Sequence, residues 1–187
     1  MSYILAASVF LIQTLFDFAI GVFLVRVMLI YAGASFYDPI CQFIYRLTNP
    51  VLAPLRKFVP RWGKIETASL LVAFVLALVE LALLGGLGGM RFGLAGLPLL
   101  ALVGVLSVAL WIMLWAILIR CVLSFFINEH DNSNARLLAQ FTEPVVRPFR
   151  FLPALGGLDF SCWFASLALI LARFLIIAPL SDLASRL

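Results

Sequence analysis

Three charged side chains stand deep inside long apolar runs, away from the basic loops that follow, where they could move ions or protons. Asp17 lies in the first run, Glu80 in the second and Arg173 in the fourth. A charge inside a membrane is costly, so it pairs with another charge or lines a polar path. Glu80 and Arg173 hold equivalent positions of an internal repeat, each about 18–20 Å into its helix at 1.5 Å per residue. We expect a Glu80–Arg173 ion pair, and both structural stabilisation and ion or proton movement remain open for the three charges.

Two further acids, Glu66 and Asp159, stand directly before apolar runs at equivalent positions of the repeat. A carboxylate at a helix start is favoured by the partial positive charge of the helix N-terminus. Each acid can also form a charge-assisted ion pair with Arg56 or Arg150, within one repeat or across the two repeats. These acids are interpreted as partners in ion pairs that hold the fold together, rather than as catalytic acids.

The other reactive residues form no recognisable catalytic or metal-binding set. His130 is the single histidine, and Cys41, Cys121 and Cys162 lack the CxxC spacing of a metal or redox site. No HExxH motif, phosphate-binding glycine loop or Ser/His/Asp set is present. The sequence therefore predicts a protein that is not an enzyme and that binds no cofactor or metal.

The composition indicates that lipid, rather than water, surrounds the elements that carry these residues. Hydrophobic residues make up 65% of the 187 residues and charged residues only 12%, whereas soluble proteins have about half and about a quarter. About 20 apolar residues of helix cross a bilayer. Four stretches are long enough, and they predict an all-α protein with four transmembrane helices, at residues 4–30, 68–84, 97–127 and 160–179.

Basic residues gather in the connections after the first and third stretches, whereas the connection after the second carries only Arg91. Short loops rich in Lys and Arg stay on the cytoplasmic side. Both basic loops are therefore expected in the cytoplasm and both chain ends outside. Because no RNA-binding or zinc motif accompanies the net charge of +4, the expected partner of these cations is a bilayer with anionic headgroups, and no nucleic acid.

Each basic loop contains an amphipathic segment. Ile40, Phe43, Ile44 and Leu47 recur at the spacing of one helix face, and Leu137, Leu138 and Phe141 hold the last three of the equivalent positions. Such a segment lies in the membrane interface or packs on the helix bundle. Recognition of a protein partner is the alternative.

A proline motif follows each segment: Thr-Asn-Pro-Val-Leu-Ala-Pro-Leu-Arg at 48–56 and Thr-Glu-Pro-Val-Val-Arg-Pro-Phe-Arg at 142–150. Asn49 or Glu143 could cap a short helical turn that the next proline begins and the second proline ends. The predicted product is a stiff connector that aims its arginine at a partner or at lipid. Its residues are Thr48, Pro50, Pro54 and Arg56 in the first copy, and Thr142, Pro144, Pro148 and Arg150 in the second.

The matching motifs divide the chain into two tandem repeats, residues 1–90 and 97–187. Arg26 matches Arg120 in the same register, and Glu66 matches Asp159 after one deletion. Because each repeat contains two crossings, the second repeat starts on the same side as the first, and the repeats run parallel.

The doubled motif, with a glycine and an acid before the second helix of each unit, resembles the YggT family, which includes YlmG-like proteins. The resemblance covers nearly the whole chain. It implies a small multi-pass protein of the bacterial inner membrane. Members are associated with osmotic stress tolerance, with division or nucleoid organisation and, in plastids, with cytochrome maturation, but no molecular activity is agreed.

We therefore expect a non-enzymatic scaffold or assembly factor, related to osmotic stress or division, that docks a membrane-protein partner or forms a homo-oligomer. The alternative is a small oligomeric channel or transporter subunit with Asp17, Glu80 and Arg173 in a polar path.

Overall fold

The computed structural model describes residues 3–34, 38–57, 66–88, 96–124, 133–149 and 160–186. Within these ranges the chain is helical: α1 (Tyr3–Tyr31), α2 (Pro39–Leu55), α3 (Thr67–Gly88), α4 (Leu97–Ser124), α5 (Ser133–Val146), the short 3-10 helix η1 (Arg147–Phe149) and α6 (Phe160–Arg186). Four of them, α1, α3, α4 and α6, are long and apolar enough to cross a membrane. The predicted all-α protein with four apolar spans is therefore confirmed.

The last span is longer than predicted. The apolar stretch predicts an end at Pro179, but α6 continues through this proline to Arg186. Pro179 is exposed at the helix surface, so its ring displaces no neighbouring helix, although within α6 it removes one backbone hydrogen bond and crowds the carbonyl four residues earlier. A proline can therefore sit within a membrane helix without ending it.

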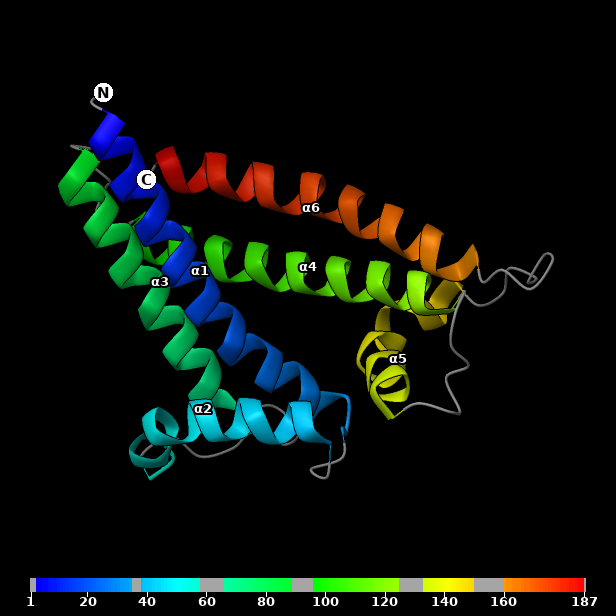
Figure 1. The fold of residues 1–187 in the computed structure, drawn as a ribbon. Helices are drawn as coiled ribbons and strands as arrows, with labels where there is room; N and C mark the ends of the chain where they lie inside the picture. Colours follow the sequence, from blue (N-terminus) through cyan, green and yellow to red (C-terminus); the bar gives the residue numbers. More distant parts are fainter. Residues whose placement is uncertain are drawn as a thin grey trace.

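The spans pack as two pairs, one from each repeat. α1 lies along α3 and α4 lies along α6, while α4 also contacts α1 and α3 (Figure 1). The start of α1 and the end of α6 lie at one end of the spans, and α2 and α5 lie at the other (Figure 1). The two repeats therefore run in the same direction.

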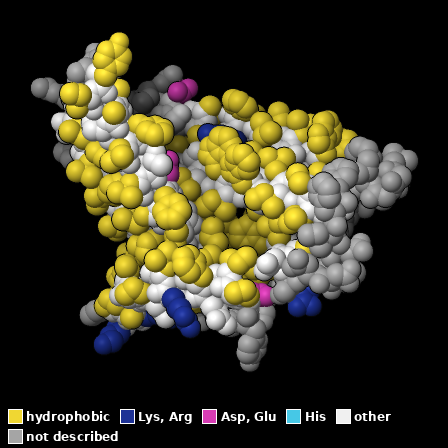
Figure 2. All heavy atoms as spheres, in the orientation of Figure 1, with side chains coloured by type: hydrophobic (Ala, Val, Ile, Leu, Met, Phe, Trp, Pro, Cys, Tyr) yellow, Lys and Arg dark blue, Asp and Glu magenta, His cyan; other side chains and the backbone are white. Residues whose placement is uncertain are grey.

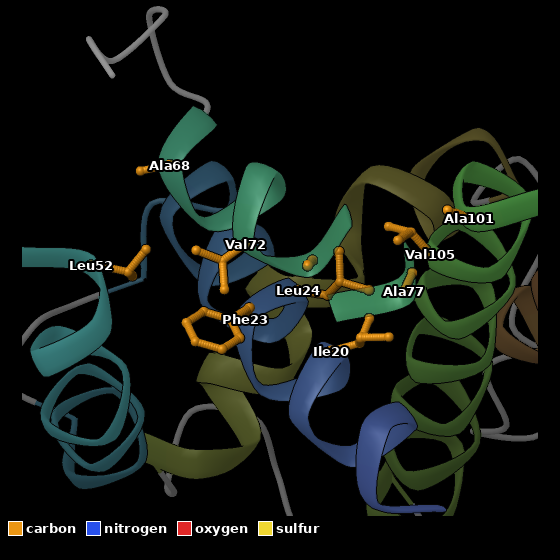
Figure 3. Packing of buried hydrophobic residues seen from close by; sticks show 10 residues of the cluster. Ile20, Phe23, Leu24, Leu52, Ala68, Val72, Ala77, Ala101 and Val105 are labelled. Carbon is orange, nitrogen blue, oxygen red and sulfur yellow. The ribbon is translucent and has the colours of Figure 1, made fainter. Parts of the chain in front are cut away.

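The first helix pair has its own hydrophobic core. Phe23 and Leu24 of α1 lie beside Val72 of α3, and Leu52 closes the core from α2 (Figure 3). Small residues, among them Ala77 of α3 and Ala101 of α4, lie where α3 meets α4. Side chains of this size let membrane helices approach closely.

Burial repeats between the two halves. Leu52 and Val146, which are 94 positions apart, are both 0% exposed, and Thr48 and Thr142 are 1% and 0% exposed. Val146 belongs to a second core between α4 and α6, as Leu52 belongs to the core between α1 and α3. Each repeat therefore buries the same face of its short helix.

The proline motif differs from its prediction. Pro50 lies inside the continuous helix α2 and Pro144 inside α5, so no new helix begins at Asn49 or Glu143, and that prediction is wrong. The motif prolines are exposed, so the ring of an internal proline meets no neighbouring helix, although it removes one hydrogen bond and crowds the carbonyl four residues earlier in its own helix. The second proline of each motif does stand at an end: α2 stops one residue after Pro54, and Pro148 falls in η1.

The apolar residues of α2 divide between two faces. Cys41, Thr48 and Leu52 are buried against the spans. An outward stripe of four large apolar side chains is 45–67% exposed: Ile40, Phe43, Leu47 and Val51. The predicted single apolar face is therefore two adjacent faces, one packed on the protein and one open to the surroundings.

Candidate functional site

Among the described residues, the largest fully buried side chain is that of Arg26 in α1, which contacts α2 and the residue before α3. Its Nε donates to Glu66 Oε2 at 2.7 Å, and one terminal nitrogen lies 3.4 Å from Oε1 of the same carboxylate. The other terminal nitrogen donates to the Thr48 hydroxyl oxygen, and the guanidinium lies 4.3 Å from the centre of the Tyr45 ring. One side chain thus joins three helices by charge-assisted contacts. We call this cluster the arginine junction.

Glu66 is shared between two arginines. It precedes α3, its backbone carbonyl accepts the first helical hydrogen bonds, and its side chain accepts a hydrogen bond from the Ser69 hydroxyl at 2.9 Å. Arg56 also binds the carboxylate, with its Nε 3.0 Å from Oε1. The Glu66 side chain is 1% exposed and that of Arg56 is 41% exposed. The junction therefore holds two positive charges against one negative charge, and Arg56 is its connection to the surface.

The environment keeps Glu66 ionised. Burial alone would raise the pKa of its carboxyl group, but the hydrogen bonds from Arg26, Arg56 and Ser69, with the charge of Arg26, outweigh burial and hold the pKa below the ordinary value of 4.5. Because Glu66 is ionised at neutral pH, its ion pairs stabilise the folded protein there. An ionised carboxylate has no proton to donate.

The second repeat rebuilds part of the junction. Arg120 of α4 donates to the Thr142 hydroxyl oxygen at 3.0 Å, as Arg26 does to Thr48. Both threonines in turn donate to the carbonyl oxygen four residues earlier, at 2.7 Å for Thr48 and 2.9 Å for Thr142. That back-bond orients the hydroxyl so that a lone pair faces the arginine. Arg120 also lies 3.4 Å from the Glu143 carboxylate.

Removing either hydroxyl tests this design. Thr48→Val and Thr142→Val keep the shape but remove a hydrogen bond to a buried cation, so each should lower the free energy of unfolding by about 1.5–3 kcal/mol. Thr14→Val is the matched control, because Thr14 makes the same back-bond to Phe10 at 2.8 Å on an exposed face. That control should stay within about 0.5 kcal/mol of the parent protein. Thermal unfolding in one detergent measures all three, and equal losses at Thr48 and Thr14 would contradict the role assigned to the hydroxyl.

The arginine–acid pairs expected from sequence have different outcomes. Arg56 and Glu66 meet within the first repeat. Arg150 and Asp159, their expected counterparts, lie outside the described residues. The sequence reasoning did not identify Arg26 as the centre of the site. Its match with Arg120 in register was the available signal, because two arginines at equivalent helix ends are unexpected for an apolar span.

The intramembrane charges are arranged differently from the expectation. Arg173 lies over the ring of Trp111 in α4, 4.3 Å from its centre, and α6 packs on α4 rather than on α3. The charge that acts on Glu80 is that of Asp17 in the neighbouring α1. Among the described residues no Glu80–Arg173 ion pair forms, because α3 and α6, which carry these side chains, each pack on α4 rather than on one another. The predicted pair is therefore absent from this arrangement.

Asp17 also lines a cavity of about 740 Å³ between α1, α2, α4 and α5. Apart from Asp17 and Asn134, its lining is aliphatic or aromatic, and Figure 2 shows the hollow surrounded by hydrophobic side chains. A cavity of this chemistry does not connect the three charges by polar groups. The arrangement gives the channel alternative no added support.

The junction itself leaves no room for a reacting molecule. Arg26, Thr48 and Glu66 are each at most 1% exposed, and in the described part of the chain every buried side-chain nitrogen or oxygen has a hydrogen-bond partner. Breaking a buried ion pair of this kind costs about 3–5 kcal/mol. The chemistry that the site supports is therefore attachment: it fixes α2, and with Arg120 also α5, to the membrane spans.

Comparison with known proteins agrees with a doubled unit. The model of the CCB3/YggT family matches residues 5–87 and again 99–180. An uncharacterized protein of Vibrio alginolyticus, encoded in the proC 3' region, is 38% identical over 91% of this chain and 95% of its own length. A second, from Pseudomonas aeruginosa, is 38% identical over 94% of this chain and 90% of its length.

The uncharacterized protein YggT of Escherichia coli K12 is 33% identical over 81% of this chain and 79% of its own length. No solved structure matches the chain. Because the family model covers both halves and these relatives align over most of their length, the chain belongs to the CCB3/YggT family.

Proposed function

We propose that this protein is a non-enzymatic scaffold or assembly factor of the bacterial inner membrane, and that α2 and α5 carry its docking surface for a protein partner. The arginine junction and its counterpart at Arg120 carry this proposal. Both repeats use a buried arginine to hold a short helix rigidly at the same end of the spans. Two short helices held rigidly on one side of the membrane, α2 and α5, can position a protein partner. Transport would instead need a polar path through the spans.

The orientation we propose places α2 and α5 on the cytoplasmic side and both chain ends outside. Described basic residues lie on these helices or directly after them: Arg46, Arg56, Lys57, Arg136 and Arg147. Lys and Arg side chains gather along the edge formed by α2 and α5 (Figure 2). Such an excess of positive charge favours the cytoplasmic side.

The exposed stripe of α2 supports a place in the membrane interface. Ile40, Phe43, Leu47 and Val51 would enter the lipid, while Arg46, exposed on the same helix, would reach the headgroups or the cytoplasm. α5 differs, since it buries Leu137 and Phe141 and exposes Arg136 and Gln140. The surface left for a partner is therefore basic, and we propose a partner with an acidic cytoplasmic surface, in osmotic stress tolerance or in division.

Site-specific photo-crosslinking in native membranes tests this proposal. A photoreactive residue at Arg46 or at Arg136 should capture one and the same partner, identified by mass spectrometry, whereas one at Leu175, which is 73% exposed on α6, should capture mainly lipid. A probe at Arg136 should lose that partner when Arg46→Glu and Arg147→Glu reverse the surface charge. No common partner at the two positions would contradict the proposal.

Flux through liposomes separates scaffold from channel. The purified protein should add no ion or proton flux to the liposomes. An ion-selective flux that Asp17→Asn or Glu80→Gln abolishes would overturn the scaffold in favour of the polar path.

A further inference from the structure

One face of the molecule combines an apolar hollow with charges of opposite sign on its two sides. The cavity of about 740 Å³ lies between α1 and α4, with Ile40 and Ile44 of α2 and Phe141 of α5 at its loop end. Asp17 stands on the α1 side, and Trp111, which carries Arg173 over its ring, stands on the α4 side. Figure 2 shows this face and its hollow.

The charges on the two sides have no ionic partners among the described residues. Asp17 and Glu80 are near enough for their charges to interact, but both are acids. Arg173 lies over the face of the Trp111 ring, and it is partly exposed. Two acids on one side and one cation on the other are therefore left within the spans, where an unpaired charge is costly.

The acid and the cation lie at the same depth. Glu80 comes 13 residues after the start of α3 at Thr67, and Arg173 comes 13 residues after the start of α6 at Phe160. At 1.5 Å per residue both are about 20 Å along their helices. Since the repeats run in the same direction, the two positions share one level in the bilayer.

We propose that two copies of this chain associate through this face, with Arg173 of each copy against the Asp17–Glu80 acid pair of the other. A two-fold axis parallel to the membrane normal keeps both copies in the same orientation. It also brings the α1 side of one copy opposite the α4–α6 side of the other. Because one side is acidic and the other basic, the contact between Arg173 and the acids is attractive, and the two-fold symmetry makes it twice.

A second copy fits this face better than a lipid molecule does. An acyl chain could fill the apolar hollow, but it would leave Asp17, Glu80 and Arg173 without ionic partners. A second copy supplies a cation for the acids and acids for the cation, and it covers apolar side chains that include Trp111 and Trp115, which are 41% and 59% exposed. Polar contacts of this kind contribute to the association of membrane helices.

Counting subunits of the full chain in lipid bilayers tests the proposal. Single-molecule photobleaching should show dimers, and Arg173→Glu should raise the dissociation constant by about 30-fold or more, because two symmetric polar contacts are lost together. The double variant Asp17→Asn, Glu80→Lys should do the same. Arg46→Glu, which changes an exposed charge on α2, is the control and should dimerise like the parent.

Mixing the two variants guards against misfolding as the cause. Arg173→Glu makes one copy wholly acidic at this level, and Asp17→Asn with Glu80→Lys makes the other wholly basic. Differently tagged copies should then co-purify as a mixed dimer, although neither forms a dimer alone. A monomeric parent protein, with or without a retained phospholipid, would overturn the proposal, as would a failure of the two variants to combine.

Discussion

Replacing Glu66 with alanine is expected to lower the free energy of unfolding by about 3–5 kcal/mol, the range measured when a buried ion pair loses one partner. The carboxylate is the single negative group of the arginine junction and balances Arg26, which is 0% exposed. Without Glu66, Arg26 would keep, in the described part of the chain, the Thr48 hydroxyl, the Asn49 side chain and the Tyr45 ring as partners. None of these carries a negative charge, so a buried cation would remain uncompensated.

Two comparisons make this prediction specific to charge balance. Arg26→Met should cost less than Glu66→Ala, because Glu66 keeps its ion pair with Arg56 and the remaining charges cancel. Glu143→Ala is the matched control: its carboxylate also contacts a buried arginine, but at 3.4 Å and with 33% of the side chain exposed. Because water can partly replace an exposed carboxylate at this distance, its loss should be smaller than that of Glu66→Ala. Unfolding midpoints in one detergent give the ranking, and a larger loss for Arg26→Met would contradict the proposed balance.

The pH dependence of stability should show the same carboxylate. The pKa of Glu66 in the folded protein lies below the ordinary 4.5, so the unfolded chain takes up the proton first as the pH falls. The stabilising contribution is therefore complete above pH 4.5 and is lost as the pH falls from there through the lowered folded pKa. Glu66→Gln should lack this part of the curve. Unfolding measured from pH 7 downward for both proteins provides the comparison.

The helices that cross the membrane could be predicted from sequence because one physical requirement determines them. A segment in lipid must be continuously apolar and must satisfy its own backbone hydrogen bonds. The apolar residues around Val72 and Val105 therefore predict membrane-spanning helices. The repeat was equally visible, since Thr48 and Thr142 stand in matching proline motifs. Burial of both threonines and of both partner arginines shows that the repeated letters mark a repeated packing site.

Pairing between elements could not be predicted in the same way. Glu80 and Arg173 occupy the same position in the two repeats. Such positions lie at the same depth in the membrane, but they need not be in contact. Which helices meet depends on packing across the whole bundle, and here α4 packs on both α3, which carries the acid, and α6, which carries the cation. The contact between Arg26 and Glu66 could not be predicted for a similar reason. Glu66 is 40 residues away in sequence, and helix α2 lies between the two residues in the chain.

Truncating Leu52 should have the next largest effect, a loss of about 2–5 kcal/mol in the free energy of unfolding for Leu52→Ala. Leu52 is 0% exposed and belongs to the core that α2 shares with α1 and α3. The cavity left by its side chain would lie one turn from Thr48, on the face that the arginine junction holds. Truncation therefore weakens the apolar half of the attachment of α2 and leaves the ionic half in place.

Val51→Ala is the control, since the neighbouring side chain is 45% exposed on the outward stripe and its truncation should change stability by about 0.5 kcal/mol or less. If α2 presents the docking surface, Leu52→Ala should also reduce the yield of partner crosslinks from Arg46, while Val51→Ala leaves the yield close to that of the parent. Equal losses of stability in the two variants would show that α2 is held by Arg26 and Thr48 alone, and unchanged crosslinking with lower stability would show that docking does not need a rigid α2.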